Sequence, residues 1–463
     1  MSKDKDNNKF PVPVEVPETV CIVPWIGMEV NSLGNYRPCC LMDGFIQDEN
    51  GNDLVATETT ISEAFNSKWM QDFRQAFLNG EKPEACKKCW AEEDAGRMSK
   101  RINATSNPNY LSRVKKDEID YNNLNPEEIY YMDIKLGNIC NFQCRICGSH
   151  SSNKLINEEI AFVSPHAKAG HIAHTYKKRG LWPRQSPTFW EDLKALLPNV
   201  LNFEITGGEP FLIKEQFELL EFAVECGEAH HIELHYNTNG STWPAHAPDI
   251  WKHFKALNVA FSIDNVGKRF EFERKNGRWD TALETIRKMN EFKLTQRLRS
   301  DKISQITTQL CLTVNIQNVF YLEEIINWAE TQDFDDIYFN MLHYPDSMAI
   351  SHMTPQAQIL AVDKLESGNF APRFKRDIQN IVKFIELGPG SDGSEFAKRT
   401  FMFDTSRGES FDSLYPEMAE AMRFKDHIKP KHFCMAPWVH TYISPQSERR
   451  MCCASREPAQ NFK

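Results

Sequence analysis

The chain has 463 residues, of which 41% are hydrophobic and 25% charged, and its formal net charge is −10. This composition excludes collagen-like, low-complexity and wholly disordered chains, and the length allows one large α/β domain with smaller modules. No apolar run approaches the roughly 18 residues of a membrane-spanning helix, and the acidic balance argues against a nucleic-acid partner. The opening MSKDKDNN is too polar for a secretory signal, so we expect a cytoplasmic protein that makes no membrane contact.

Thirteen cysteines are the unusual feature of this composition. An odd number in a chain without an export signal disfavours a disulfide framework, so their positions matter more than their number. Eleven of them fall in three groups: Cys21, Cys39, Cys40, Cys86 and Cys89; Cys140, Cys144 and Cys147; and Cys434, Cys452 and Cys453. The other two, Cys226 and Cys311, lie in apolar-rich stretches and are expected to be buried side chains.

The first part of the chain is expected to be a polar arm followed by a compact module. Residues 1–20 are polar and spaced by prolines, and the cysteine-rich module runs over 21–115. Its clearest element is a helix predicted at 61–79, because large apolar residues recur there at every fourth position. Residues 97–128 are polar and rich in Asn, Lys and Arg, which suits a linker.

A repeated strand, loop and helix pattern fills residues 129–345. Strands are predicted at 129–135, 201–206, 232–237, 259–264, 309–315 and 336–341. Helices are predicted near 149–161, 214–226, 246–256, 279–293 and 319–331. Six such steps predict a parallel sheet, with fewer strands than the eight of a complete barrel. Residues 346–430 are polar and weakly periodic, with helices expected at 355–366 and 372–386.

Three cysteines lie in the loop after the first of these strands. Cys140, Cys144 and Cys147 form a C-x3-C-x2-C motif. Three thiolates on one tight loop can hold three irons of a [4Fe–4S] cluster, which leaves the fourth iron open to a small chelating molecule. A zinc site is the alternative, and it needs a fourth ligand such as His150.

The next predicted strand ends in Gly207-Gly208-Glu209-Pro210. Glycines at this point let a ligand approach the backbone closely, and the carboxylate of Glu209 can accept a hydrogen bond from an ammonium group. Because the carboxyl ends of parallel strands meet at one edge, this tetrapeptide is expected beside the cysteine motif.

Together the C-x3-C-x2-C loop and the GGEP segment resemble the signature of the radical S-adenosylmethionine (SAM) enzymes, over about residues 130–345. The resemblance implies an α/β fold with a partial (β/α)6 barrel of the radical SAM type. It implies that Cys140, Cys144 and Cys147 hold a [4Fe–4S] cluster and that the open iron binds the methionine part of SAM. Ile146 departs from the family, which usually has an aromatic residue beside the last cysteine.

The same resemblance implies further SAM contacts at the ends of successive strands. The GGE segment places Gly207, Gly208 and Glu209 at the SAM amino group. Later strand ends resemble the family's ribose and carboxylate contacts and add these residues: Asn239, Ser262, Asp264 and Asn315. No spacing selects the catalytic acid, base or hydrogen donor.

The first cysteine module resembles the SPASM/twitch extensions of radical SAM enzymes, in which C-x(n)-G-x4-C and C-x-x-C elements bind auxiliary [4Fe–4S] clusters. The resemblance implies one closed auxiliary cluster on Cys21, Cys39, Cys86 and Cys89, with Cys40 the alternative to Cys39. A zinc-ribbon-like site is the other interpretation. These extensions usually follow the barrel, whereas here the module precedes it.

Residues 431–463 are expected to be an incomplete second module of the same kind. Cys434 and Cys452 are 18 positions apart, as are Cys21 and Cys39, and a Pro-Trp pair follows the first cysteine in both copies. The second copy has no counterpart of the Cys86-x-x-Cys89 pair. Whether it binds a cluster stays open.

The resemblance implies a radical SAM enzyme that cleaves SAM reductively to a 5′-deoxyadenosyl radical and abstracts a hydrogen atom from its substrate. Modification of a peptide or protein is the expected function, by family analogy. The alternatives are modification of a small molecule or nucleoside, and a non-catalytic iron–sulfur protein for electron transfer or scaffolding. A reductant such as flavodoxin or ferredoxin is the expected partner.

Overall fold

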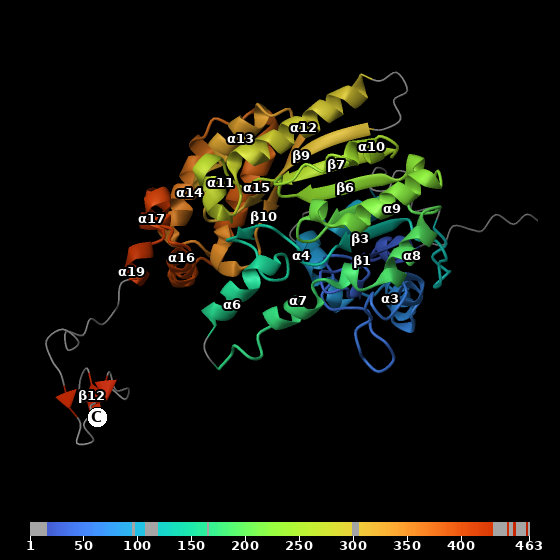
Figure 1. The fold of residues 1–463 in the computed structure, drawn as a ribbon, viewed down its shortest axis with the longest axis horizontal. Coiled ribbons are helices and arrows are strands. Elements are labelled where there is room, and N and C mark those ends of the chain that lie inside the picture. Colours follow the sequence, from blue (N-terminus) through green and yellow to red (C-terminus); the bar gives the residue numbers. More distant parts are fainter. Residues whose placement is uncertain are drawn as a thin grey trace, which may run out of the picture.

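The computed structural model describes residues 16–94, 98–106, 119–163, 166–298 and 305–428, together with the strand backbone at 442–443, 448–450 and 460–461. Its centre is an eight-stranded sheet of order β10-β9-β7-β6-β5-β3-β1-β2 (Figure 1). Six strands correspond to the predicted ones: β3 (Tyr131–Lys135), β5 (Asn202–Thr206), β6 (Glu233–Thr238), β7 (Ala256–Ser262), β9 (Gln305–Val314) and β10 (Asp336–Met341). All six pair in parallel, so the predicted α/β class with a mostly parallel sheet is confirmed.

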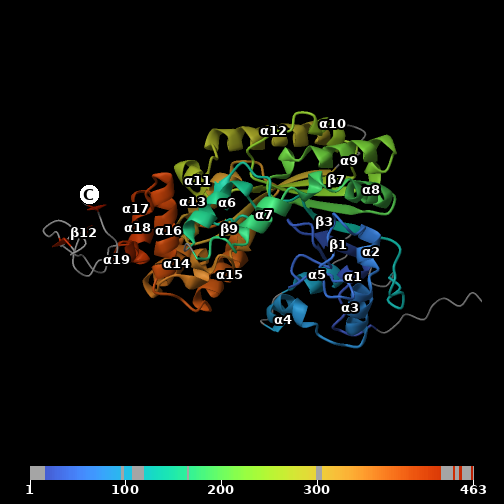
Figure 2. The same ribbon diagram turned by 60° about the horizontal axis from the view of Figure 1, so that its bottom comes forward.

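Helices that alternate with these strands cover one face of the sheet, and Figure 2 shows them along one side. They are α8 (Pro187–Leu196), α9 (Lys214–Glu225), α10 (Ala247–Trp251), α11 (Gly267–Glu273), α12 (Trp279–Arg297) and α13 (Leu322–Glu330). Burial alternates along the strands, and the buried residues of β5 are Phe203 and Ile205. Apolar residues on that face pack against the helices, since this removes the largest apolar area from water.

The helix predicted at 246–256 extends too far at its C-terminal end. Helix α10 stops at Trp251, and the strand β7 starts at Ala256 rather than at 259. The backbone from Ala256 onward pairs with both β6 and β9, so sheet hydrogen bonds on two sides replace the helix. Cys226 was also expected to be buried and is exposed, because it caps the end of α9; Cys311 is half-buried.

The N-terminal module joins the sheet through two short strands, β1 (Gly27–Val30) and β2 (Tyr36–Arg37). Strand β1 pairs in parallel with β3. At Gly27 a side chain would meet the carbonyl oxygen of Tyr131 at 2.5 Å, so only glycine allows this close approach. The sheet therefore continues across the division that we expected between the first module and the barrel.

The single helix predicted at 61–79 is two helices, α2 (Ile61–Phe65) and α3 (Lys68–Leu78). Ser67 starts α3, because its side-chain oxygen accepts a hydrogen bond from the backbone N–H of Met70 at 3.3 Å. The apolar spacing was the same in both helices, so it did not reveal the break. The other described helices of this module are α1 (Val23–Ile26), α4 (Lys87–Asp94) and α5 (Lys100–Ser106), and α5 lies where a linker was expected.

Residues after the sheet form a helical layer whose buried apolar residues join the core of the sheet. Its helices are α14 (Pro355–Ser367), α15 (Lys375–Glu386), α16 (Ser394–Arg407), α17 (Phe411–Leu414), α18 (Pro416–Ala421) and α19 (Phe424–Ile428). Two of them match the predicted helices, whereas α16 was not predicted. On α15, Ile378, Ile381 and Ile385 are buried along one face.

Three further strands pair in a small sheet near the end of the chain: β11 (Tyr442–Ile443), β12 (Glu448–Arg450) and β13 (Gln460–Asn461). These strands fall within the predicted second cysteine module, but its cysteines, Cys434, Cys452 and Cys453, lie outside the described residues, as does most of the N-terminal arm. Among the helices that the structure describes, none has the length and apolar character to cross a bilayer.

Candidate active site

The core cysteine loop, residues 140–147, follows the carboxyl end of β3. Its middle forms a two-residue strand, β4 (Gln143–Cys144), that pairs antiparallel with β8 (Arg274–Lys275). A tight turn then brings the backbone N–H of Cys147 to the carbonyl of Cys144 at 3.2 Å. The structure therefore places the three predicted cysteines on one compact loop, with Cys140 and Cys144 buried.

The surroundings of this loop disfavour the free ionised forms of Cys140 and Cys147 and favour that of Cys144. Burial raises the pKa of Cys140 to about 12. The hydrogen bond between the other two thiols raises the pKa of Cys147 well above its ordinary value and lowers that of Cys144. Such buried thiols ionise when a metal binds, because the metal replaces the proton.

Arg274 is the charged partner of this loop that the sequence did not reveal. Its guanidinium donates to the Cys144 sulfur at 3.8 Å and to the carboxylate of Asp264 at 2.5 Å. Asp264 also accepts from the backbone N–H of Thr313 at 2.9 Å. A buried Arg–Asp pair thus joins the predicted strand-end carboxylate to a predicted cysteine.

The Gly207-Gly208-Glu209 segment lies against the backbone that leads into the cysteine loop. The N–H of Glu209 donates to the carbonyl of Ile139 at 2.8 Å. A side chain at Gly208 would meet that carbonyl oxygen at 2.2 Å, and Gly207 has a φ of +124°. The direction in which a side chain would point is filled by the chain itself at both glycines, and the ligand approach expected at their backbone stays a prediction. The glycines fix the distance between β5 and the cysteine loop.

The carboxylate of Glu209 is fully buried and ties the end of β5 to the end of β6. It accepts hydrogen bonds from the backbone N–H of Asn239 at 2.7 Å, the hydroxyl of Thr238 at 2.8 Å and the N–H of Phe211 at 3.2 Å. Burial nevertheless raises the pKa of Glu209 to about 7. An ammonium group beside this carboxylate would favour its ionised form.

Of the other predicted SAM contacts, Asn239 reaches the cysteine loop, whereas Asn315 bonds within its own turn. The side-chain amide of Asn239 points to the Cys140 sulfur at 3.7 Å and donates to the side-chain carbonyl of Asn141 at 3.0 Å. Asn315 is buried and holds its own turn, donating to the carbonyl of Thr313 and accepting from the N–H of Gln317. Ser262 is half-buried at the end of β7.

The N-terminal module gathers four cysteines around a second site, which we call the cysteine pocket. It is lined by Cys21, Cys39, Cys86 and Cys89, together with apolar residues such as Val23 and Phe77. Cys40 is not part of the lining, and its sulfur accepts a hydrogen bond from Lys100 at 3.0 Å. The geometry therefore favours Cys39 over Cys40, the choice that the sequence left open.

The four thiols surround the cysteine pocket and do not converge on a single coordination point. Burial raises the pKa of Cys21 and of Cys86 to about 12. Across the described ranges, no three Cys, His, Asp or Glu side chains are grouped closely enough to hold a single metal ion. Four thiols set around a pocket suit a group larger than one ion, such as a cluster.

Two family models match this chain. Residues 134–329 match the Radical SAM superfamily, and residues 21–90 match SPASM, an iron-sulfur cluster-binding domain. Residues 134–329 are thus a radical SAM domain. A SPASM module precedes this domain in the chain, and the cofactors of the two domains are [4Fe–4S] clusters and SAM.

No curated protein sequence matches this radical SAM chain. Solved structures with a similar fold include native anSMEcpe with bound AdoMet and the Cp18Cys peptide, at 13% identity and a TM-score of 0.33. That match covers 55% of this chain and 62% of the other, so the chain spans less than two thirds of its length. Streptococcus suis SuiB is similar in its complex with S-adenosylmethionine (12% identity, TM-score 0.30, 96% of this chain and 85% of that one). Its complex with the precursor peptide SuiA gives 14% identity, a TM-score of 0.30, and 95% and 85% coverage.

The face of the radical SAM sheet that the α8–α13 helices leave uncovered carries a row of polar side chains, which we call the interior row. The strand registers align one residue from each of seven strands: Arg37, Glu29, Asp133, Glu204, His235, Asn258 and Thr307. Both ends of the row are paired: Arg37 and Lys135 bind Glu29 at 2.6 and 2.7 Å, and the amide of Asn258 donates to Thr307 at 2.8 Å.

The centre of the interior row holds two neighbouring carboxyl groups, Asp133 and Glu204. Asp133 is 2% exposed, and its Oδ1 atom has no hydrogen-bond partner. Burial raises the pKa of Asp133 well above its ordinary value, and Glu204 and the Cys40 thiol raise it further. This buried carboxyl group of the sheet is therefore in its neutral form over a wide pH range.

Proposed function

We propose that the chain binds a [4Fe–4S] cluster on Cys140, Cys144 and Cys147, with SAM at the open iron. Once reduced by an external donor, a cluster held there would supply one electron to the sulfonium of bound SAM, and with it the radical chemistry that removes a hydrogen atom from the substrate. The observation that carries the proposal is that the three cysteines share one loop and that Glu209 and Arg274, from other strands, both lie against it.

The chain's own groups can bind and orient SAM at this edge of the sheet. Glu209 is suited to an ammonium group, because its carboxylate is already oriented by three hydrogen bonds. Arg274 offers a cation beside Cys144, to which a carboxylate can bind. The proposed contacts are those that the family resemblance implied: Gly207, Gly208, Glu209, Asn239, Ser262, Asp264 and Asn315.

The cysteine pocket is proposed to hold the auxiliary [4Fe–4S] cluster on Cys21, Cys39, Cys86 and Cys89. Four thiols close such a cluster and leave no iron open to a substrate. The chain would then consist of a SPASM module at 21–115, a radical SAM core at 129–345 and a helical region at 346–430. Residues 431–463 would add an incomplete second module.

A peptide or protein is the proposed substrate, by analogy with the radical SAM enzymes that carry SPASM modules. The interior row supports a polar substrate group, because Asp133 presents a buried acceptor without a partner. The proposed reductant is a flavodoxin or ferredoxin of the cytoplasm.

Reductive cleavage of SAM tests this function directly. The full chain is reconstituted anaerobically with iron and sulfide, reduced with dithionite, and assayed for 5′-deoxyadenosine by mass spectrometry. We expect the wild-type chain to form it, the Cys140→Ala variant to form none, and about eight irons per wild-type chain. Absence of 5′-deoxyadenosine from a wild-type chain with a loaded, SAM-responsive cluster would overturn the proposal. A short precursor-peptide frame beside the gene would support the peptide substrate.

A further inference from the structure

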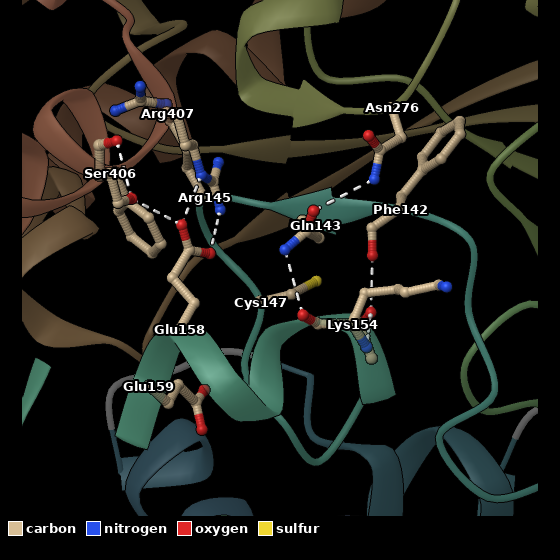
Figure 3. Close-up of polar contacts among 12 residues, drawn as sticks. Phe142, Gln143, Arg145, Cys147, Lys154, Glu158, Glu159, Asn276, Ser406 and Arg407 are labelled. Carbon is tan, nitrogen blue, oxygen red and sulfur yellow. Dashed lines mark hydrogen bonds and ion pairs between the residues drawn. The ribbon is translucent and has the colours of Figure 1, made fainter. Parts of the chain in front are cut away.

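Helix α16 reaches the core cysteine loop from more than 240 residues further along the chain. It presents Arg399, Asp404 and Arg407 toward the loop and the helix that follows it, α6 (Ile156–Phe162). Figure 3 shows Arg407 and Ser406 turned toward Glu158 of α6, and the Arg407 guanidinium binds that carboxylate at 2.7 Å. The helix therefore packs on the outer side of the loop.

The loop is tied to α16 through Arg145, one of the two residues between its second and third cysteines. Arg145 is 1% exposed, and its guanidinium binds Asp404 at 2.6 Å and Glu409 at 2.5 Å. It also stacks on the ring of Phe272 at 3.7 Å from the ring centre. The two carboxylates more than neutralise Arg145, so this contact is an anchor and supplies no positive charge to the loop.

Arg399 makes a different kind of contact. Its guanidinium donates to the backbone carbonyls of Arg145 at 3.0 Å and of Cys147 at 3.3 Å. These carbonyls bracket the last turn of the cysteine motif, so the bonds fix the direction in which the Cys147 side chain leaves the backbone.

Arg399 forms no ion pair among the described residues, and its buried Nε atom has no hydrogen-bond partner. The acidic group that acts most on its charge is Glu159, whose carboxylate accepts a hydrogen bond from the backbone N–H of Ser149 at 2.7 Å. The carbonyls that it binds carry only partial charges. Arg274, by contrast, is paired with Asp264. Glu159 acts on Arg399 without a direct ion pair, whereas the guanidinium contacts the Cys147 carbonyl, so its positive charge can also offset negative charge at Cys147.

We infer that Arg399 is a positioning residue for the core cluster: it presets the Cys147 turn for cluster binding, and its charge raises the cluster's reduction potential. The inference rests on the proposed function, because it needs a cluster on Cys140, Cys144 and Cys147. Hydrogen bonds and charge around the ligands set the potential of iron–sulfur clusters, and partners behind metal ligands commonly change metal affinity about 10- to 100-fold.

The test compares the Arg399→Gln and Arg399→Lys variants of the full, anaerobically reconstituted chain with the wild type. The rate of iron release to a chelator measures how tightly the cluster is bound. A redox titration followed by the SAM-sensitive EPR signal measures the midpoint potential of the core cluster alone. We expect Arg399→Gln to release core iron about 10- to 100-fold faster and to have a more negative midpoint potential. Arg399→Lys keeps the charge without the two-pronged hydrogen bond, so we expect a potential near that of the wild type with faster iron release.

The Arg373→Gln variant is the control, because Arg373 pairs with Glu330 on the surface and touches no part of the loop. We expect it to match the wild type in both measurements. Wild-type iron release and potential in Arg399→Gln would overturn the inference, while the proposed function would stand. If Arg399→Gln does not fold, the same wild-type release in Arg399→Lys would overturn the positioning role. A wild-type chain that binds no SAM-sensitive cluster would instead overturn the proposed function.

Discussion

Arg274 lies between Cys144 and Asp264, 3.8 Å from the sulfur of one and 2.5 Å from a carboxylate oxygen of the other. The arginine is on β8, the cysteine is on the antiparallel partner β4, and the aspartate follows the end of β7. All three side chains are buried. One cation thus links the cysteine loop to the strand ends at which SAM is proposed to bind.

Replacing Arg274 by methionine is expected to destabilise the apo chain by about 3–5 kcal/mol, because it leaves the carboxylate of Asp264 buried without its cation. Chemical denaturation of the apo form measures this. The control is Arg287→Met, which removes an exposed pair with Glu284 on α12 and should cost less than about 1 kcal/mol. Equal losses of unfolding free energy in the two variants would show that the buried Arg274–Asp264 pair stabilises the chain no more than an exposed pair does.

The sequence located those parts of the site that depend on local pattern. Alternation and strand length predicted the six parallel strands, and their carboxyl ends bring Glu209, Asn239 and Cys140 together as expected. The roles of these residues at SAM stay predictions. Asn315 shows the limit of the pattern, because an asparagine at a strand end can equally hold its own turn.

The residues that the sequence did not reveal act through long-range contacts. Arg274 meets Cys144 across 130 positions, and Arg399 meets Cys147 across 252. Nothing in the local sequence of a basic residue says that its charge will be buried against a distant loop. Strand β1 was missed for a related reason: four residues carry too little periodicity, and its place is decided by pairing with β3.

Serine variants of Cys39 and Cys40 are expected to separate the two neighbouring thiols. Cys39 lines the cysteine pocket, whereas Cys40 lies outside it and faces Lys100. Cys39→Ser should therefore bind about four irons per chain and Cys40→Ser about eight. Iron and sulfide analysis after anaerobic reconstitution measures both. The opposite result would assign the cluster to Cys40.

Glu273 should make the stability of the apo chain fall as the pH rises. Its buried carboxyl accepts hydrogen bonds from Tyr415 at 2.7 Å and Asn265 at 2.8 Å, yet burial and the nearby Asp264 raise its pKa from 4.5 to about 7. The folded state therefore holds this proton more tightly than the unfolded state. The stabilisation is complete below pH 4.5 and is lost between pH 4.5 and about 7, by roughly 3 kcal/mol.

The Glu273→Gln variant isolates this effect, because glutamine does not titrate. Denaturation of both chains at a series of pH values should show the wild type losing stability relative to the variant across that window. Tyr415→Phe removes a hydrogen bond that favours the ionised carboxylate, so it should extend the loss to higher pH. A constant difference between wild type and Glu273→Gln from pH 4.5 to 8 would contradict the prediction.

Arg74 is expected to hold the SPASM module together. It is fully buried, and its guanidinium donates to the backbone carbonyls of Pro24 at 2.8 Å, Leu124 at 2.7 Å and Phe65 at 2.8 Å. Burial without a carboxylate partner lowers its pKa to about 10. Pro24 lies three positions after Cys21, so the contact fixes the segment that brings this cysteine to the pocket.

The Arg74→Met variant removes all three donors and leaves buried carbonyls without partners, each at about 1–3 kcal/mol. We expect the unfolding free energy to fall by at least about 3 kcal/mol and the iron content to fall from about eight to about four, with the SAM-sensitive EPR signal of the core cluster retained. Lys68→Met on the same helix is the matched control, because Lys68 makes only an exposed pair with Asp72 and should leave iron content unchanged. Loss of both clusters in Arg74→Met would show that the module and the barrel fold as one unit, and full iron content would show that the cysteine pocket does not depend on Arg74.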